Sequence, residues 1–361
     1  MTEQPVGSPM MLSTTSLTMV AGEGGRACAV GPIGEQSFSS YFGSVCLDAF
    51  GGPWPTSLGR IDPIAGATNG GIRATLGAPT GVAAITGQSG GPASAVAQFT
   101  PSFESGVPPE WTVLDGKNAH HAKFLTRAGD GSFFAGLTFE APPYAFLELH
   151  HLGLPTPTVT PAIACAATHL EADAAEDDGT VIVATSSGRT FGSCSDDDGS
   201  PTGPTRLQVV AVSGPDSPTL LYEEDFGEPL LDVRMEDAGD AVWVVVAMTE
   251  AFAVRRLLKT GDLAWSGDGL APDAASRVFD VAMLGDQLLV AYPLLQSSGF
   301  GLRVEAIAPD GDIHPLGEFE AELDPLSIAL TTSPTADAVV VAYRNFPAGQ
   351  VVARRFDCVS D

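Results

Sequence analysis

Seven short apolar segments recur along the chain, and each has an alanine at or near its end that serves here as its anchor. They read RACAV, GVAAIT, SFFAGL, VIVAT, VWVVVAM, QLLVAY and AVVVAY, anchored at Ala29, Ala84, Ala135, Ala184, Ala247, Ala291 and Ala342. Successive anchors are 55, 51, 49, 63, 44 and 51 residues apart. Recurrence at such intervals is typical of an array of similar supersecondary units, and a short apolar strand in each unit predicts the blades of a β-propeller.

Each apolar segment is expected to form the second strand of a four-stranded unit. A turn rich in Gly or Asp precedes most of them, as in Gly129-Asp130-Gly131, and these residues tolerate the positive φ angles of tight hairpins. A third, alternating segment follows, such as AFLELHH from Ala145, and a fourth, such as TLLYEED from Thr219, completes the unit. The 41 Gly and 28 Pro residues suit a chain with many turns.

The sequence therefore predicts an all-β fold, a seven-bladed β-propeller of four-stranded antiparallel blades that forms one domain over residues 1–361. The expected blades span approximately residues 13–62, 68–116, 118–160, 162–226, 229–268, 276–320 and 325–358. Little chain remains after the third strand of the last unit, so that blade lacks an outer strand of its own. Because an open edge exposes unpaired backbone groups, we expect the N-terminal segment 1–12 to pair there and close the ring.

Five cysteines are present, at Cys28, Cys46, Cys165, Cys194 and Cys358. We expect two disulfides within blades, Cys28–Cys46 on neighbouring strands and Cys165–Cys194 on either side of a hairpin, with Cys358 as a free thiol. Two alternatives stay open. One is that all five are buried thiols, because free Cys is a favoured core residue. The other is that ring closure brings the termini together and pairs Cys358 with Cys28 or Cys46. Disulfides form in oxidising compartments, so the first interpretation places the protein outside the cytoplasm.

The N-terminal segment does not look like a signal peptide. It reads MTEQPVGSPMM, with the acidic Glu3 where basic residues are expected, and the next ten residues are too polar for a signal core. Because the expected disulfides place the protein outside the cytoplasm, secreted, periplasmic or on the cell surface, we expect this sequence to be a mature form without its signal peptide. No apolar run approaches the ~18 residues that a membrane-spanning helix needs, so membrane insertion is not expected.

Acidic residues dominate the charge of the chain. It has 44 Asp and Glu against 17 Lys and Arg, a formal net charge of -27. Such a protein repels phosphate backbones and anionic lipid, so no nucleic acid partner is expected. The simplest interpretation is that the charge keeps the protein soluble, and the alternative is that it recruits cations or a basic partner.

The third unit, RAGDGSFFAGLTF from Arg127, has a Gly-Asp turn that leads into an apolar strand with small residues near its end. In this it resembles the repeats of bacterial extracytoplasmic seven-bladed β-propellers, in which a Gly-Asn or Gly-Asp turn precedes a strand ending in Thr-Gly. The resemblance extends along the chain as a rhythm, but no WD dipeptide or kelch double glycine recurs. It implies the propeller fold and an extracytoplasmic location, and it supplies no catalytic residue because that family is functionally heterogeneous.

Candidate binding residues lie in the loops between second and third strands, because ligands usually approach a propeller at a face built of loops. Several of these loops contain aromatic residues and two contain an arginine, a combination that suits a sugar or peptide surface. The candidates are Phe42, Phe139, Tyr144, Arg189, Phe191, Phe300, Arg344 and Phe346. The alternative is that the rings pack the loops onto the blades.

The longest interval, 63 residues, contains an insertion at residues 186–205 with three consecutive aspartates. Asp196 and Asp198 are candidate calcium ligands, because adjacent carboxylates repel one another unless a cation lies between them. Carboxylates alternate in a typical calcium loop and do not alternate here, so the alternative is a solvated acidic loop held by the Cys165–Cys194 bridge. Calcium is the one candidate cofactor.

Known catalytic motifs are absent from the sequence. It has no Gly-x-Ser-x-Gly, no Walker loop, no His-Glu-x-x-His and no Cys-x-x-Cys. We therefore expect a non-catalytic binding or structural propeller that recognises a protein or glycan partner through its loop face. The alternatives are a polysaccharide-directed hydrolase or lyase acting at the same face, and a protomer of a surface assembly or filament, with the oligomeric state open.

Overall fold

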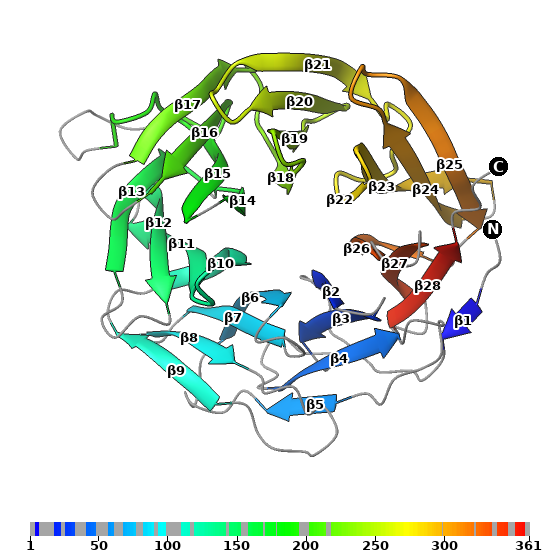
Figure 1. Cartoon of the computed structure of the whole chain (residues 1–361), viewed down its shortest axis with the longest axis horizontal. Coiled ribbons are helices and arrows are strands. Elements are labelled where there is room, and N and C mark those ends of the chain that lie inside the picture. The colour runs from blue at the N-terminus through cyan, green and yellow to red at the C-terminus, as the bar shows by residue number, and fades with distance from the viewer. Residues whose placement is uncertain are drawn as a thin grey trace. The chain divides into compact units, whose positions relative to one another are not determined.

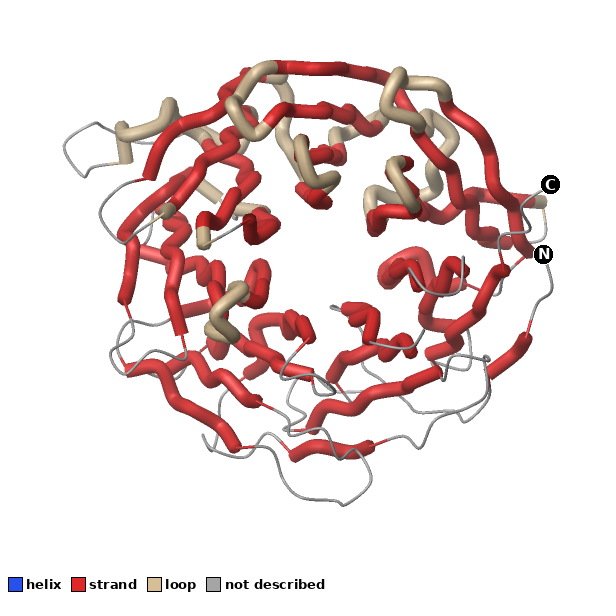
Figure 2. Tube along the Cα trace, viewed as in Figure 1, coloured by secondary structure: helices blue, strands red, loops and turns tan. Residues whose placement is uncertain are grey.

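In the computed structural model of this chain, side chains are described for residues 122–138, 145–152, 163–168, 170–176, 179–194, 202–213, 218–297, 299–319, 328–332, 338–343, 352 and 354–356. In the remaining strands the backbone alone is described. Over these parts of the chain the regular structure consists of 28 strands (Figure 2). No helix within them is long and apolar enough to cross a membrane.

One compact unit comprises residues 115–272 together with 92–94. Its described strands form three four-stranded sheets, each in chain order. The first contains β10 (Ala119–Arg127), β11 (Phe133–Ala141), β12 (Tyr144–Leu152) and β13 (Thr158–Ala166). The second contains β14 (Ala172–Asp177), β15 (Thr180–Ser187), β16 (Arg206–Val212) and β17 (Pro218–Asp225). The third contains β18 (Asp232–Asp237), β19 (Ala241–Ala247), β20 (Phe252–Leu258) and β21 (Leu263–Leu270).

The other compact unit comprises residues 1–91, 95–114 and 273–361. Its described strands form four four-stranded sheets. The first contains β2 (Thr18–Gly22), β3 (Arg26–Pro32), β4 (Tyr41–Leu47) and β5 (Ser57–Arg60). The second contains β6 (Thr68–Leu76), β7 (Val82–Ser89), β8 (Ala93–Gln98) and β9 (Glu110–Asp115). The third contains β22 (Asp280–Leu284), β23 (Gln287–Gln296), β24 (Gly299–Ile307) and β25 (Ile313–Glu320). The fourth contains β26 (Leu323–Ser333), β27 (Ala338–Asn345), β28 (Val351–Asp357) and β1 (Gln4–Val6).

The seven apolar segments of the sequence form the second strand of each sheet, as predicted: β3, β7, β11, β15, β19, β23 and β27. Where side chains are described, these strands are buried along nearly their whole length, and β19 is buried at every position. A strand covered on both faces has a continuous apolar run instead of an alternating one. The fourth strands β17 and β21 are mostly exposed or half-buried, in keeping with their polar sequences.

The first strands of successive sheets pack beside one another within each unit (Figure 1). In the unit of residues 115–272, β14 contacts β10 and β18. In the other unit, β26 contacts β22 and β2, and β2 also contacts β6. Four-stranded antiparallel sheets related in this way are the blades of a β-propeller. The predicted all-β propeller fold is therefore confirmed, while the closure of all sheets into one seven-bladed ring stays a prediction.

The N-terminal strand β1 pairs with the free edge of β28, with Gln4 opposite Arg355 and Val6 opposite Ala353. It supplies the fourth strand of the last sheet. The described pairing covers residues 4–6 of the predicted segment, and residues 7–12 lie outside the described part of the chain. Pairing at this edge satisfies backbone groups of β28 that have no other strand beside them in the sheet.

The small residue that ends each apolar segment lies opposite the first strand of its sheet. Three fully buried anchors, Ala184, Ala247 and Ala291, face Asp173, Asp232 and Asp280. Asp173 accepts a hydrogen bond from the N–H of Met235 on β18 at 3.0 Å, and Asp280 accepts one from Leu330 on β26 at 2.7 Å. Because directly opposed side chains share one face of a sheet, a small anchor leaves space for the aspartate that links its sheet to the next.

Replacing Asp173 by alanine is expected to lower the free energy of unfolding by about 1–2 kcal/mol, because the N–H of the buried Met235 loses its acceptor. Urea denaturation followed by tryptophan fluorescence measures the change. Asp286→Ala, at an exposed turn between β22 and β23, is the control and is expected to have little effect. Equal effects of the two substitutions would contradict the role assigned to Asp173.

Candidate functional site

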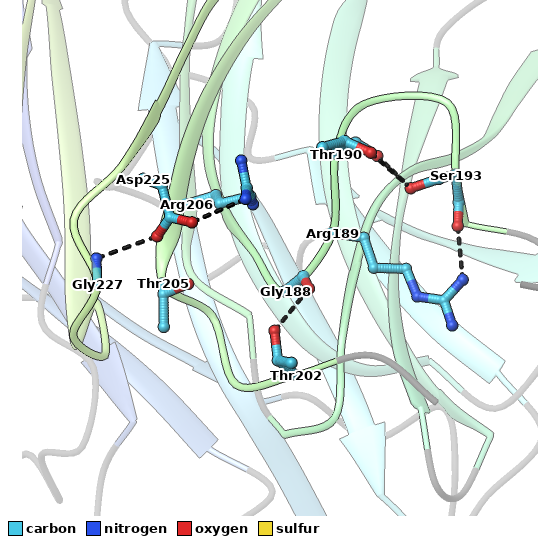
Figure 3. A pocket seen from close by; sticks show the side chains of 9 residues that line it. All are labelled: Gly188, Arg189, Thr190, Ser193, Thr202, Thr205, Arg206, Asp225 and Gly227. Carbon is cyan, nitrogen blue, oxygen red and sulfur yellow. Dashed lines mark hydrogen bonds and ion pairs between the residues drawn. The ribbon is translucent and has the colours of Figure 1, made fainter. Parts of the chain in front are cut away.

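The loop between β15 and β16 borders a cavity of about 600 Å³ within the unit of residues 115–272. Figure 3 shows the residues that line it, which are Gly188, Arg189, Thr190, Ser193, Thr202, Thr205, Arg206, Asp225 and Gly227. This volume falls in the range of small-ligand sites, roughly 300–1,000 Å³. Each described lining residue other than the two glycines has a polar or charged side chain.

The described parts of this loop are attached to β13 of the preceding sheet. Cys165 on β13 forms a disulfide with Cys194 in the loop, and its carbonyl oxygen accepts the N–H of Gly188 at 2.8 Å. Ala167, just after β13, donates its N–H to the carbonyl oxygen of Thr202 at 3.0 Å. A Cβ atom on Gly188 would overlap that Thr202 carbonyl, so the close approach of the two loop ends requires glycine.

Buried polar side chains hold the loop to its own sheet as well. Gln208 on β16 is 1% exposed, and its Nε2 donates to the carbonyl oxygen of Arg189 at 2.7 Å and to Glu223 Oε2 at 2.9 Å. The same carboxylate oxygen accepts the N–H of Phe191 at 2.9 Å. The backbone from Arg189 to Phe191 is therefore fixed in place by one amide and one carboxylate.

Two oppositely charged residues of the lining face each other across β16 and β17. Arg206 and Asp225 are directly opposed in the register, with Nη2 and Oδ2 2.7 Å apart, and Arg206 Nη1 lies 3.4 Å from Glu223 Oε1. The N–H of Gly227 donates to Asp225 Oδ1 at 3.0 Å. This hydrogen bond, with smaller contributions from Thr205 and Arg206, holds the pKa of the Asp225 carboxyl below its ordinary value, so it is ionised at neutral pH.

The described lining of this cavity offers hydrogen-bonding groups. Among its described residues there is one carboxyl group, that of Asp225, and no His, Tyr, Lys or Cys side chain. Glycoside hydrolysis uses two carboxyl groups, one of which must be held protonated. The neighbouring Glu223 does not fill that role, because its carboxylate oxygens contact Gln208, Phe191 and Arg206.

A second charged cluster joins two sheets of the same unit away from the cavity. Arg255 on β20 is 2% exposed and donates to both carboxylate oxygens of Glu224 on β17, at 2.7 and 2.9 Å, and to Asp268 on β21 at 2.7 Å. Tyr222 donates to Glu224 at 2.7 Å, and the Phe226 ring lies 5.0 Å from the guanidinium carbon. Arg255 lowers the pKa of Glu224, while burial, followed by Glu224, raises the pKa of Tyr222 to about 12. This cluster is a connection between sheets.

A serine and a histidine also meet at the turn between β10 and β11. Ser132 Oγ lies 2.6 Å from His151 Nε2 and donates to Asp130 Oδ1 at 2.5 Å, and the His151 ring stacks on Phe134. Burial lowers the pKa of His151, so the ring is neutral at pH 7. A nucleophilic serine needs access to substrate and a base to take its proton. Ser132 is 5% exposed and donates its proton to Asp130, so this cluster stabilises the turn.

The structure describes three of the predicted ligand-binding side chains. Arg189 lines the cavity. Phe191 and Phe300 are half-buried and pack against apolar clusters of their own units, as the alternative of rings holding loops to the sheets predicts. Of the two in the unit of residues 115–272, Arg189 borders the cavity and Phe191 packs inward. The other predicted side chains lie outside the described residues: Phe42, Phe139, Tyr144, Arg344 and Phe346.

The predicted pairing of Cys165 with Cys194 is confirmed, and its predicted position within one blade is wrong. Cys165 belongs to β13, the outer strand of one sheet, and Cys194 follows β15 of the next, so the bridge joins two sheets. The error arises because the outer strand continues to residue 166, past the boundary expected between the third and fourth units. A bridge between sheets restrains the loop against its neighbour.

The remaining cysteine and metal predictions are not tested. The register of β3 and β4 places Cys28 directly opposite Cys46, and their side chains lie outside the described residues. Cys358, Asp196 and Asp198 also lie outside them. Among the described residues, no three His, Cys, Asp or Glu side chains are grouped to hold a metal ion.

Four residues that line the cavity were not predicted from the sequence: Thr202, Thr205, Arg206 and Asp225. A signal for the charged pair exists, because Arg206 begins a third strand and Asp225 ends the fourth, and antiparallel pairing brings such positions together. The same arrangement places Arg303 of β24 opposite Glu318 of β25. Which of these pairs lies at a cavity depends on the preceding loop, and the strand pattern does not contain that information.

No protein-family model matches this chain, and no curated protein matches it by sequence. Solved structures match it by fold. A PL25 ulvan lyase bound to a saccharide has a TM-score of 0.58 and 10% identity, covering 97% of this chain and 93% of the lyase. The polysaccharide lyase Uly1 has a TM-score of 0.55 and 6% identity over 97% of this chain and 90% of that one.

A prolyl endopeptidase has a TM-score of 0.52 and 14% identity over 97% of this chain. The match covers 51% of the endopeptidase, so this chain spans about half the length of that protein. These likenesses establish that the chain has the propeller fold of proteins with different activities. Because one fold hosts many functions, the function has to be argued from the site.

Proposed function

We propose that this protein is a non-catalytic extracytoplasmic binding protein that recognises a glycan in the cavity beside the β15–β16 loop. The observation that carries the proposal is the lining, whose described residues combine four hydroxyl groups, two guanidinium groups and one carboxylate and include no aliphatic or aromatic side chain. Such a lining offers hydrogen-bond partners on every side and suits a ligand covered with hydroxyl groups.

The fixed conformation of the loop supports a binding role. The Cys165–Cys194 disulfide, Gln208 and Glu223 hold the described loop backbone before any ligand enters. A site that is already ordered loses little conformational entropy on binding, so few contacts give useful affinity.

A glycan fits this site better than a protein partner does. Protein interfaces bury about 800 Å² per partner and centre on aromatic and apolar anchors. The aromatic side chain of this loop, Phe191, instead packs against the apolar cluster of its unit. The exposed part of the loop presents hydroxyl groups, such as those of Thr190 and Thr202.

The lining also favours binding over catalysis. The one carboxyl group among its described residues, that of Asp225, is held ionised by Gly227, so it is not available as a general acid. The similar ulvan lyase has a bound saccharide, so the propeller fold is compatible with a carbohydrate ligand. The extracytoplasmic location is supported by the Cys165–Cys194 disulfide, since such bonds persist in oxidising compartments.

A glycan array probed with the labelled protein, followed by calorimetric titration of each hit, tests the proposal. Arg206→Ala removes a guanidinium group of the cavity and is expected to weaken binding about 10- to 100-fold, as the loss of a charged hydrogen bond does. Arg234→Ala is the matched control, because Arg234 is similarly exposed, pairs with Asp232 and lies on β18 outside the lining. Its expected effect on binding is less than twofold.

Each hit is also incubated with the protein at high concentration and analysed by mass spectrometry for shortened or unsaturated products. Recovery of the intact glycan supports a non-catalytic role. Product formation that Arg206→Ala abolishes would overturn it in favour of a hydrolase or lyase. An array without hits, or hits that Arg206→Ala and Arg234→Ala affect equally, would remove the cavity from consideration as the glycan site.

A further inference from the structure

We infer that the ligand of this cavity is an uncharged sugar segment that donates hydrogen bonds, and that the Arg206–Asp225 pair contacts two neighbouring hydroxyl groups of it. This inference rests on the proposed function and narrows the class of glycan. It follows from the direction of the hydrogen bonds in the lining and from the balance of its charges.

Three of the four hydroxyl groups of the lining already donate their protons to the protein. Thr202 donates to the carbonyl oxygen of Gly188 at 2.7 Å, and Ser193 donates to that of Thr190 at 2.6 Å. Since the Ser193 proton is used, the 3.1 Å contact between the Thr190 and Ser193 hydroxyls takes its proton from Thr190.

These three hydroxyl groups, of Thr190, Ser193 and Thr202, therefore have lone pairs and no proton left for a ligand. A ligand that bonds to them must supply the protons, and sugar hydroxyl groups do so. An anionic group such as a uronate or a sulfate needs donors and finds acceptors at these three positions. Arg206 is the exposed guanidinium donor of the described lining, because Arg189 donates from Nη1 to the carbonyl oxygen of Ser193 and its Nη2 is buried.

The two guanidinium groups do not make the cavity an anion site, because Arg206 is paired with acidic residues and Arg189 donates to a backbone carbonyl oxygen. Arg206 lies 2.7 Å from Asp225 and 3.4 Å from Glu223, and Arg189 uses Nη1 to donate to the carbonyl oxygen of Ser193 at 2.8 Å. The formal charges of these four side chains cancel. The protein as a whole carries a net charge of -27, which repels acidic polymers further. A cationic ligand is disfavoured in turn by the two arginines.

The Arg206–Asp225 pair has the geometry to contact two adjacent hydroxyl groups. The planar guanidinium offers donors directly beside a carboxylate that offers acceptors, and both are held in place by the strand register and by Gly227 (Figure 3). A hydroxyl group both donates and accepts, so one sugar hydroxyl accepts from Arg206 while its neighbour donates to Asp225. Arg206 and Asp225 have side-chain exposures of 28% and 41%, so both are accessible to a ligand.

Calorimetric titration with two sets of probes of equal length tests this inference. The uncharged set is glucose-, mannose- and galactose-based tetrasaccharides, and the acidic set is tetragalacturonate and tetramannuronate. The wild-type protein is expected to bind at least one uncharged probe tenfold or more tightly than either acidic probe. Asp225→Asn removes the negative charge beside Arg206 and is expected to reduce this preference at least fivefold. Asp268→Asn makes the same charge change on β21, outside the lining, and should leave the preference unchanged.

Tighter binding of an acidic probe by the wild-type protein, lost in Arg206→Ala, would overturn this inference while leaving the glycan site in place. Failure of every probe and every array glycan to bind would instead overturn the proposed function. Thr202→Val serves if Asp225→Asn does not fold, since it removes one of the accepting hydroxyl groups from the lining and should weaken the uncharged probe at least fivefold. An unchanged affinity in that variant would contradict the inference.

Discussion

Replacing Cys165 and Cys194 together by alanine is expected to lower the free energy of unfolding by about 3–4 kcal/mol. The bridge joins residues 29 positions apart, and closing a loop of that length in the unfolded chain costs this much conformational entropy on the chain-entropy model. Urea denaturation of the oxidised protein, monitored by tryptophan fluorescence, measures the change. Cys358→Ala changes a cysteine outside this bridge that is predicted to be a free thiol, and it should shift the midpoint little. A midpoint that the double substitution leaves unchanged would contradict the prediction.

The same double substitution is expected to weaken the proposed glycan binding about tenfold or more. Ser193 lines the cavity and immediately precedes Cys194, so the bridge fixes the turn from Thr190 to Ser193. Without it, the ordering of this turn adds to the cost of binding. Hydrogen exchange should increase at residues 190–194 and stay low in β15, which separates loosening of the loop from unfolding of the sheet.

The strand arrangement was predictable from sequence because the burial of each strand follows its position in the sheet. Second strands such as β19 are buried on both faces and form continuous apolar runs, which identified them directly. The small anchor residue was identified from the sequence because it recurs in every unit, but its contact with the first strand of the sheet was not predicted. Its role depends on an aspartate of the first strand, such as Asp173, whose acceptor role toward the next sheet only three-dimensional structure shows.

The cavity was less predictable because its composition differs from the surface that was expected. The aromatic residues of the loops suggested a stacking surface, and the described rings Phe191 and Phe300 fill apolar clusters instead. A phenylalanine ring is more stable when it is packed under a loop than when it is exposed to water. Its presence in a loop sequence therefore does not distinguish a packing role from a ligand-binding role. The boundary error at Cys165 has a similar cause, since an outer strand ending AIACA is as apolar as a strand that begins a unit.

Arginines on third strands recur as partners of acidic residues on fourth strands. Arg206 pairs with Asp225, Arg303 with Glu318, and Arg255 with Asp268. In a chain with few basic residues, these pairs tie the outermost strand to its sheet. Arg206 and Arg303 have side-chain exposures of 28% and 26%, so solvent screens their pairs, whereas Arg255 is 3% exposed and also reaches Glu224 of the preceding sheet. The pair in the cavity is therefore accessible to a ligand, and the Arg255 cluster is the one on which stability depends most.

Arg255→Ala is accordingly expected to lower the free energy of unfolding by about 2–3 kcal/mol. Removing one member of a buried ion pair commonly costs about 3–5 kcal/mol, and the lower figure applies because Glu224 and Asp268 keep side-chain exposures of 30% and 68%. Most of the loss should come from Glu224, which is left beside Tyr222 without its cation. Arg255→Met with Glu224→Gln removes both charges and should recover at least half of the loss, as measured by urea denaturation. Arg256→Ala on the same strand, paired with the exposed Asp240, is the control for losing an arginine.

The pH dependence of the Arg255 substitution distinguishes this electrostatic account from loss of packing. Arg255 holds the pKa of Glu224 below its ordinary value of 4.5, so the folded state binds the proton more weakly than the unfolded state does. The stability from this group is fully present above about pH 4.5 and is lost as the pH falls through the lowered pKa of the folded state. The difference in unfolding free energy between wild type and Arg255→Met should therefore be largest at neutral pH and shrink toward pH 3. A difference that stays constant between pH 7 and pH 3 would show that Arg255 acts through packing on Phe226 and not through Glu224.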